Sequence, residues 1–316
     1  MTDHILAGVT VPVMTPLGAD GRPDDAATVT LLTSLADTGV DSVLLLGSNG
    51  EGALLPPDLT RRFVRMGVEL WHELRPAGSV VVNVSAPGTT ETLRRAETAL
   101  EGAPDALLVT PPSYFAHRAD EIEQHLRAIE QLGHPWAIYN VPKYASALTA
   151  EVLGAVLDCP HLVGLKDSSG DLTLLRSFVA VIAERPDLAL SQGDERNLAE
   201  GLRSGAKGIV PGLANIVPSL IVSLRDATAA GRHQEADALQ ERVTSLTGVH
   251  AIRPGVPTVK AILHDRGVLP NDRCAPPLRS VDVDELERLR HFLSPFEPWL
   301  IRAVDSPLDS HQERPT

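Results

Sequence analysis

At residues 162–170 the chain reads Leu-Val-Gly-Leu-Lys-Asp-Ser-Ser-Gly. A short apolar run bounded by turn residues predicts a buried strand, which here ends in Lys166 at the edge of an apolar core. Burial disfavours the ammonium form, and a desolvated lysine can form a Schiff base with a carbonyl substrate. The ordinary alternative is a strand-end lysine that reaches solvent or pairs with an acid, because charged residues are mostly exposed.

Outward from this segment, short apolar runs alternate with helical patterns along the chain. The predicted strands are residues 9–15, 42–46, 80–84, 106–109, 136–139, 162–166, 188–191 and 208–210. Each is followed by a helical pattern, and eight such units predict an α/β fold, the (β/α)8 TIM barrel. An open doubly wound sheet is the competing topology, but it usually has fewer strands. No glycine-rich nucleotide motif follows the first strand, as that topology would favour.

Three more helical patterns follow the eighth unit, at residues 234–246, 256–263 and 283–293. They predict a C-terminal helical extension packed on the barrel. We therefore divide the chain into a catalytic barrel at 1–231, a helical appendix at 232–300 and a flexible polar tail at 301–316.

Composition narrows the class of function. The net charge of -13 argues against nucleic acid as a partner, because phosphate binding needs a basic surface. No run approaches the roughly 20 apolar residues that span a bilayer, and the N-terminus lacks the pattern of a signal peptide. Cys159 and Cys274 lie far apart in the sequence and have no metal-binding or redox spacing. This fits a protein in a reducing compartment. We expect a cytoplasmic protein with no membrane partner.

Polar residues collect where the predicted strands end, which is where TIM barrels carry their catalytic groups. Tyr139 ends the fifth strand and Lys166 the sixth, so the phenol and the amine should meet across neighbouring strands. A Schiff-base enzyme needs such a proton carrier beside its amine. After the second strand, the amides of Ser48 and Asn49, expected just before a helix, suit a carboxylate. Together these groups fit a 2-oxo acid.

Each of these residues also has a simpler interpretation. Tyr139 alone would be a packed core tyrosine, and Ser48-Asn49 an ordinary turn. For Asp194 and Glu195, capping of the next helix is favoured over catalysis. A phosphate loop at residues 47–52 is disfavoured, because no Gly-Lys-Ser/Thr follows. The eleven histidines form no HExxH or His-x-His group, which argues against a metal-dependent aldolase.

Three motifs carry a resemblance to a known family. They are Gly-Ser-Asn-Gly-Glu at 47–51, Tyr-Asn-Val-Pro at 139–142 and Gly-Leu-Lys-Asp-Ser-Ser-Gly at 164–170. Over about residues 5–300 the chain resembles the dihydrodipicolinate synthase / N-acetylneuraminate lyase family of class I pyruvate-dependent aldolases. The resemblance implies that Lys166 forms an imine with pyruvate or a longer 2-oxo acid. Tyr139 would be the acid/base, Ser48 the hydroxyl of the proton relay, and Ser48 and Asn49 the carboxylate holders.

The same resemblance implies further site residues. Tyr114 resembles the tyrosine that such enzymes lend to a neighbouring subunit, and Ile209 resembles a residue that touches pyruvate. Ser168, Gly193 and Asp194 complete the expected substrate-binding set. The family is usually a tetramer built from dimers, so the resemblance implies a homo-oligomer. No metal or organic cofactor is implied.

One departure from the family's motifs argues against one of the family's activities. Dihydrodipicolinate synthases carry an arginine where this chain has Tyr144, and the neighbouring Lys143 does not replace a bidentate guanidinium. Ser48-Asn49 resembles the turn of 4-hydroxy-2-oxoglutarate and 2-keto-3-deoxy sugar acid aldolases. We therefore expect a carbon–carbon lyase that cleaves a 4-hydroxy-2-oxo acid to pyruvate and an aldehyde. The alternatives are condensation or sugar-acid dehydration through the same imine, a non-enzymatic 2-oxo acid binder, and a metal-dependent aldolase.

Overall fold

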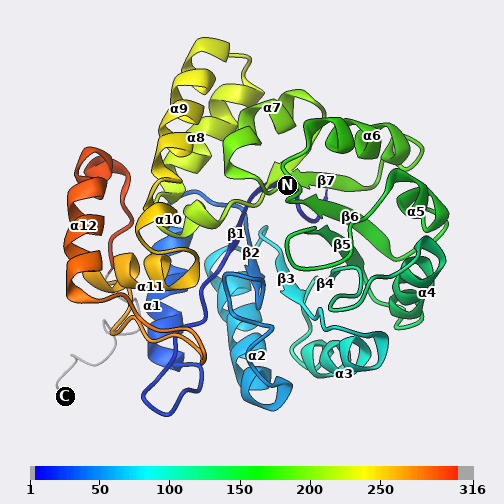
Figure 1. The fold of residues 1–316 in the computed structure, drawn as a ribbon, viewed down its shortest axis with the longest axis horizontal. Coiled ribbons are helices and arrows are strands. Elements are labelled where there is room, and N and C mark those ends of the chain that lie inside the picture. Colours follow the sequence, from blue (N-terminus) through cyan, green and yellow to red (C-terminus); the bar gives the residue numbers. More distant parts are fainter. Residues whose placement is uncertain (1–3, 305–316) are drawn as a thin grey trace, which may run out of the picture.

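Eight parallel strands close into a barrel in the computed structural model, which describes residues 4–304 (Figure 1). Each strand pairs with the next, and β1 closes the ring against β8. The predicted TIM barrel is therefore confirmed. The strands are β1 Gly8–Pro12, β2 Ser42–Leu45, β3 Val80–Asn83, β4 Ala106–Val109, β5 Trp136–Asn140, β6 Leu162–Asp167, β7 Ala189–Gln192 and β8 Gly208–Ile209.

A ring of helices surrounds the strands (Figure 1). Some begin at side-chain caps: Asp24 accepts the Ala27 N–H at 3.0 Å to start the first helix, and Thr149 caps the fifth. The helices of the ring are α1 Asp25–Ala36, α2 Pro57–Leu74, α3 Thr89–Leu100, α4 Ala119–Glu130, α5 Ala150–Ala155, α6 Leu172–Ile182, α7 Leu198–Arg203 and α8 Pro218–Ala229.

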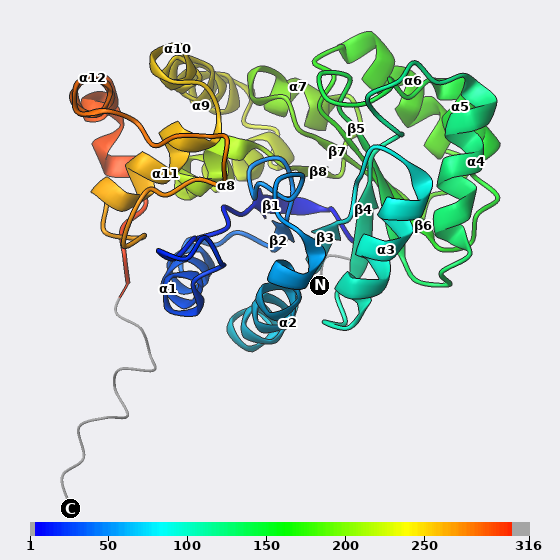
Figure 2. The same ribbon diagram turned by 60° about the horizontal axis from the view of Figure 1, so that its bottom comes forward.

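The remaining helices form the C-terminal extension, which both views place on one side of the barrel, beside α8 and α1 (Figures 1 and 2). They are α9 His233–Leu246, α10 Val249–Ile252, α11 Val256–Asp265 and α12 Val283–Leu293. Short 3-10 turns occur at η1 Glu195–Asn197, η2 Gly212–Asn215 and η3 Ser294–Trp299. α9 packs along α8, so the extension continues the outer ring.

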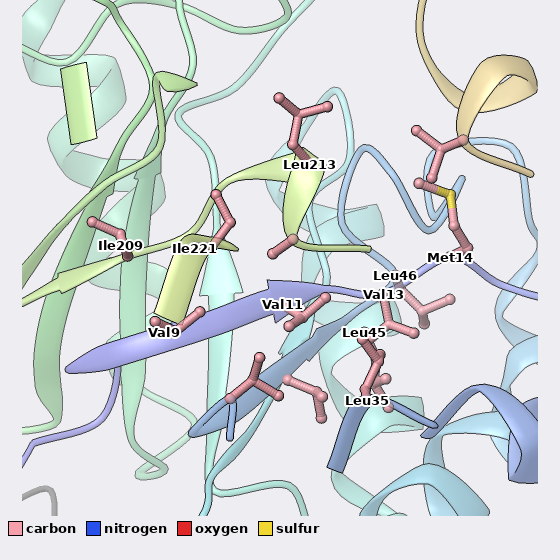
Figure 3. Close-up of a cluster of buried hydrophobic side chains, with 14 of the residues drawn as sticks. Val9, Val11, Val13, Met14, Leu35, Leu45, Leu46, Ile209, Leu213 and Ile221 are labelled. Carbon is pink, nitrogen blue, oxygen red and sulfur yellow. The ribbon is translucent and has the colours of Figure 1, made fainter. Parts of the chain in front are cut away.

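Strand alternation produces two separate apolar cores. Side chains that face outward fill the space between strands and helices; Val9 and Val11 of β1 lie there with Ile221 of α8 (Figure 3). Side chains on the inner face, such as Leu44, fill the barrel and make the second cluster. Alternate residues along a strand therefore face opposite sides, one toward the barrel interior and the next toward the helices.

The end of the described chain returns to the barrel. Ile301 is buried, and its N–H donates to the Ile216 carbonyl at 2.9 Å. Residues 305–316 of the predicted tail lie outside the described residues, and the division at 231 and 300 stays a prediction. Between residues 4 and 304, no helix combines the length and hydropathy needed to cross a bilayer.

Candidate active site

Lys166 and Tyr139 lie side by side inside the barrel. The β5–β6 register pairs the two residues, as expected for neighbouring strands. The Lys166 Nζ is 4.2 Å from the centre of the Tyr139 ring. Lys166 is 4% exposed and Tyr139 is 6% exposed, so the amine is held in an apolar barrel beside a phenol rather than in solvent.

The surroundings of Tyr139 stabilise its phenolate. Burial by itself raises the pKa of the Tyr139 phenol, but the positive charge of Lys166 acts in the opposite direction. Hydrogen bonds to the phenol oxygen from Ser48, Ser168 and Lys166 add to this effect. The result is a Tyr139 pKa below its ordinary value, which suits a group that takes up and returns a proton.

The turn after β2 presents backbone amides toward the same place. Within the described residues, no protein acceptor takes a hydrogen bond from the N–H groups of Ser48 and Asn49. The expectation that these amides start a helix is wrong, because α2 begins only at Pro57. Free amides in a tight turn still form an anion-binding concavity without a helix behind them.

The turn after β2 has a strained backbone conformation. Leu46 and Glu51 both have positive φ, at 56° and 57°, which is uncommon for residues with a side chain. A Cβ on Gly52 would lie 1.9 Å from the Leu46 carbonyl oxygen, so only glycine fits where the turn folds back on itself. Strain of this kind persists only where neighbouring contacts over-determine it.

A buried ion pair supplies such contacts and was not foreseen from the sequence. The Glu51 carboxylate pairs with the Lys260 ammonium of α11, and both side chains are 0% exposed. Glu51 also accepts the Ala275 N–H at 2.6 Å, and Lys260 donates to the Arg273 carbonyl at 2.8 Å. The C-terminal extension therefore fixes the turn that carries Ser48 and Asn49.

A second buried pair, Asn140 and Asp167, lies on the outer face of β5 and β6. These residues directly follow Tyr139 and Lys166 in the sequence. The Asn140 Nδ2 donates to the Asp167 Oδ1 at 2.7 Å, and the Leu148 N–H donates to the Asn140 Oδ1 at 3.0 Å. Burial raises the pKa of Asp167 against the hydrogen bonds from Asn140 and Ser169 that lower it. Both residues belong to the quoted motifs, but their mutual contact was not predicted.

After β7 the chain passes close to Lys166. A Cβ on Gly193 would lie 2.1 Å from the Ser168 Oγ and 3.2 Å from the Lys166 Cε, so a glycine is required beside the amine. The Asp194 carboxylate instead accepts the Arg196 N–H at 3.4 Å and the Asn197 Nδ2 at 2.6 Å, where it caps η1. The structure thus brings Gly193 and Ser168 to the site, whereas Asp194 is engaged in capping.

Glu195 turns back toward the barrel end. Its Oε1 accepts the Leu213 N–H at 3.0 Å. A Cβ on Gly212 would come within 2.9 Å of the Asn49 Nδ2 and 3.2 Å of this carboxylate. Burial raises the pKa of Glu195, although the Leu213 and Gly212 N–H groups and the Lys166 charge lower it. Sequence reasoning favoured a cap here, and nothing in the pattern distinguished Glu195 from Asp194.

Ile209 does not face the site, and Tyr114 lies on the surface, where its expected role in a neighbouring subunit stays a prediction. Ile209 belongs to the outer core, where it lies with Val9 and Ile221 (Figure 3), and its neighbour Val210 belongs to the inner cluster with Tyr139. The assignment of Ile209 is therefore corrected: strand alternation puts the next residue inside. Tyr114 is 88% exposed and contacts Phe115 edge to face, with ring centres 4.9 Å apart.

A cavity of about 510 Å³ opens beside these groups. Its walls come from the turn after β2, the segments after β3, β4 and β5, and the start of α11. Ser48, Asn49 and Tyr139 line it. Across residues 4–304, no group of three or more His, Cys, Asp or Glu side chains has a metal-binding arrangement.

Comparison with known proteins shows which family the chain is similar to. The sequence model described as the dihydrodipicolinate synthetase family matches residues 5–295. An uncharacterised DapA-like lyase from Halobacterium salinarum is 33% identical over 282 residues, which cover 89% of this chain and 90% of that protein. The N-acetylneuraminate lyase of Rhizobium meliloti is 28% identical over 300 residues, 93% of this chain and 96% of that enzyme.

Solved structures agree at the level of the fold. The prophage protein YagE of E. coli K12, a dihydrodipicolinic acid synthase family member solved with pyruvate, superposes with a TM-score of 0.86 at 22% identity. The match covers 93% of this chain and 99% of that one. With the family match spanning the barrel and most of the extension, the chain belongs to the dihydrodipicolinate synthetase family, as its three motifs predict.

Proposed function

We propose that this chain is a Schiff-base aldolase that cleaves a 4-hydroxy-2-oxo acid to pyruvate and an aldehyde. The observation that carries the proposal is the buried Lys166 amine 4.2 Å from the ring centre of Tyr139, its register partner. A buried lysine beside a phenol with a lowered pKa combines a nucleophile and a proton carrier in one place.

The reaction begins at the ketone of the substrate. The Lys166 amine attacks C2, and the carbinolamine loses water to give an iminium. Proton transfers in both steps pass through Tyr139, with Ser48 beside it. Tyr139 then accepts the proton of the C4 hydroxyl, the C3–C4 bond breaks, and its electron pair moves into the iminium. The aldehyde leaves, the enamine takes a proton at C3, and water releases pyruvate from Lys166.

The amides of Ser48 and Asn49 would hold the substrate carboxylate. They are free of protein acceptors within the described chain and sit in a turn fixed from behind by Glu51 and Lys260. This placement sets the orientation of C2 toward the amine, and orientation is a large part of the rate of such reactions. No metal or organic cofactor enters any step.

The resemblance names 4-hydroxy-2-oxoglutarate and 2-keto-3-deoxy sugar acids as substrates to try first. Condensation with an aldehyde acid, as in dihydrodipicolinate synthesis, is less well supported. Tyr144 stands at the family's arginine position and is 57% exposed, and the Lys143 ammonium lies 5.1 Å from its ring centre. Dehydration through the same imine, and binding without turnover, remain the alternatives, because the fold alone does not define the activity. We also propose a cytoplasmic homo-oligomer.

Lys166→Ala tests this function. It should abolish pyruvate release from 4-hydroxy-2-oxo acids, whereas the matched variant Lys207→Ala, at an exposed lysine outside the site, should leave it unchanged. Full activity in Lys166→Ala would refute the imine mechanism. Unaltered turnover in excess chelator would exclude a metal-dependent aldolase.

A further inference from the structure

Asp167 is a buried carboxylate that has no cation beside it. Its side chain is 0% exposed, and within residues 4–304 it forms no ion pair with a lysine, arginine or histidine. Buried charges in proteins are normally paired with an opposite charge or bound to a metal. The proposed reaction assigns no step to this carboxylate, so its place in the fold calls for another explanation.

Hydrogen bonds alone hold the two oxygens of Asp167. Oδ1 accepts the Asn140 Nδ2 at 2.7 Å and the Ser169 N–H at 3.2 Å, and Oδ2 accepts the Ser169 hydroxyl at 3.0 Å. The Asp171 carboxylate, at the start of α6, acts on Asp167 through its like charge and raises its pKa. All the hydrogen-bond partners are donors, which is the arrangement that an ionised carboxylate needs.

Asn140 connects this carboxylate to the loop after β5. Its Oδ1 accepts the Leu148 N–H at 3.0 Å, which fixes the amide with Nδ2 toward Asp167. Backbone hydrogen bonds reinforce the connection: the Ser168 N–H donates to the Asn140 carbonyl at 2.9 Å, and the Gly193 N–H donates to the Asp167 carbonyl at 2.7 Å. The ends of β5, β6 and β7 therefore meet at these two residues.

Each member of the pair directly follows a residue of the proposed reaction. The strand register pairs Tyr139 with Lys166 and, one step further, Asn140 with Asp167. Because side chains alternate along a strand, the phenol and the amine face the barrel interior while the polar pair faces outward. Ser168, which helps to lower the pKa of Tyr139, comes next in the chain. Separating Asn140 from Asp167 would therefore move the amine relative to the phenol.

We propose that Asn140 and Asp167 are positioning residues that hold the ends of β5 and β6 so that Tyr139 can move protons at the Lys166 imine. This inference rests on the proposed function. The pair acts through the strand ends and touches no reacting atom. Two apolar side chains could fill the same space, but they would not fix the direction of the strand ends and the following loops by hydrogen bonds.

The reaction that tests the pair is the exchange of the methyl hydrogens of pyruvate for deuterium in D2O, followed by NMR at saturating pyruvate. It needs the imine and a proton carrier but no aldehyde. The Lys166 iminium loses a C3 proton to become the enamine, and the enamine takes a deuteron at C3, so atoms and electrons balance. The quantity compared is the ratio of variant rate to unchanged rate at each pH.

Asn140→Asp replaces the donor with a second carboxylate. Two carboxylates in contact cannot both stay ionised, so at low pH they share one proton, which keeps the contact. At higher pH both ionise and repel each other, and the strand ends separate. We expect a ratio near one at about pH 5 that falls by at least about 10-fold at about pH 8, because small displacements of reacting groups are costly.

The exchanged variant, Asn140→Asp with Asp167→Asn, again places one amide opposite one carboxylate. It should recover most of the rate lost at high pH. Asp167→Asn alone keeps an acceptor opposite the Asn140 amide, so its rate should stay within about threefold of the unchanged enzyme at every pH. The matched control Asn271→Asp adds a carboxylate in the loop between α11 and α12 and should leave the ratio at one.

Thermal unfolding at each pH shows whether a variant is folded, and Asp167→Asn keeps the test open should Asn140→Asp fail to fold. A ratio for folded Asn140→Asp that does not depend on pH, or no recovery in the exchanged variant, would overturn the inference. So would a loss of 10-fold or more in Asp167→Asn, because the contact would then not be what matters. Absence of both exchange and a borohydride adduct in the unchanged enzyme would instead refute the proposed function.

Discussion

Tyr139 is the residue on which the proposed chemistry depends most after the lysine. Its ring lies against the Lys166 ammonium in the inner apolar cluster, and the Ser48 and Ser168 hydroxyls help to lower the pKa of its phenol. A phenol held this way can move a proton between the imine and the C4 hydroxyl. A tyrosine that only packs in the core would not need its hydroxyl group.

Tyr139→Phe separates these two roles, because phenylalanine keeps the ring and removes the oxygen. We expect kcat for pyruvate release to fall by roughly 10²–10⁴-fold, the usual contribution of a general acid/base, with a much smaller change in KM. Steady-state kinetics measures this, with thermal unfolding as the control for folding. A kcat within threefold of the unchanged enzyme would exclude Tyr139 as the proton carrier.

The ion pair between the β2 turn and α11 acts at the scale of elements. Glu51 and Lys260 are both fully buried, and a charge left alone in such a place is strongly destabilising. Lys260→Met should therefore lower the free energy of unfolding by about 3–5 kcal/mol. The double variant Glu51→Gln, Lys260→Met should recover much of that loss.

Urea unfolding measures both effects. Arg176→Met is the matched control, since Arg176 pairs with Glu200 on the surface and such a pair contributes about 0–1 kcal/mol. Equal losses for Lys260→Met and Arg176→Met would mean that the buried pair does not hold the turn.

α3 and α4 are joined by a buried histidine that makes stability depend on pH. His125 is 2% exposed, its Nδ1 lies 2.9 Å from the Thr89 Oγ1, and burial lowers the pKa of His125 to about 4. Between pH 6.5 and 4 the unfolded chain binds a proton that the folded protein does not. The free energy of unfolding should thus fall by roughly 3 kcal/mol as the pH drops through this range.

His125→Gln should remove that part of the pH dependence, because glutamine does not titrate. Unfolding by urea at pH 6.5 and at pH 4.5 gives the slope for each protein. His233→Gln, at an exposed position, should keep the slope of the unchanged chain. If His125→Gln showed the same slope as His233→Gln, the histidine would not be buried in its neutral form.

For the molecule as a whole, the order of elements could be predicted from apolar periodicity. The predicted strand 106–109 matches β4, and the other predicted strands agree with the structure to within a few residues. The four-residue α10 escaped prediction, because a single turn has no periodicity to detect. The 3-10 turn η1, at the start of the helical pattern after the seventh strand, escaped for the same reason.

The site was predictable where it depends on topology. The meeting of Tyr139 and Lys166 follows from the order of β5 and β6. Ile209 was misplaced because β8 is two residues long, too short to set the parity of its faces. The contact between Glu51 and Lys260 joins segments far apart in the sequence, and local patterns carry no information about such pairs.

The most direct test of the central claim is borohydride reduction of the protein in the presence of pyruvate, read by intact and peptide mass spectrometry. The chain has four lysines, at positions 143, 166, 207 and 260, so the adduct can be assigned without ambiguity. We predict a single reduced pyruvyl adduct on Lys166. No adduct in folded protein, or an adduct on another lysine, would contradict the imine mechanism.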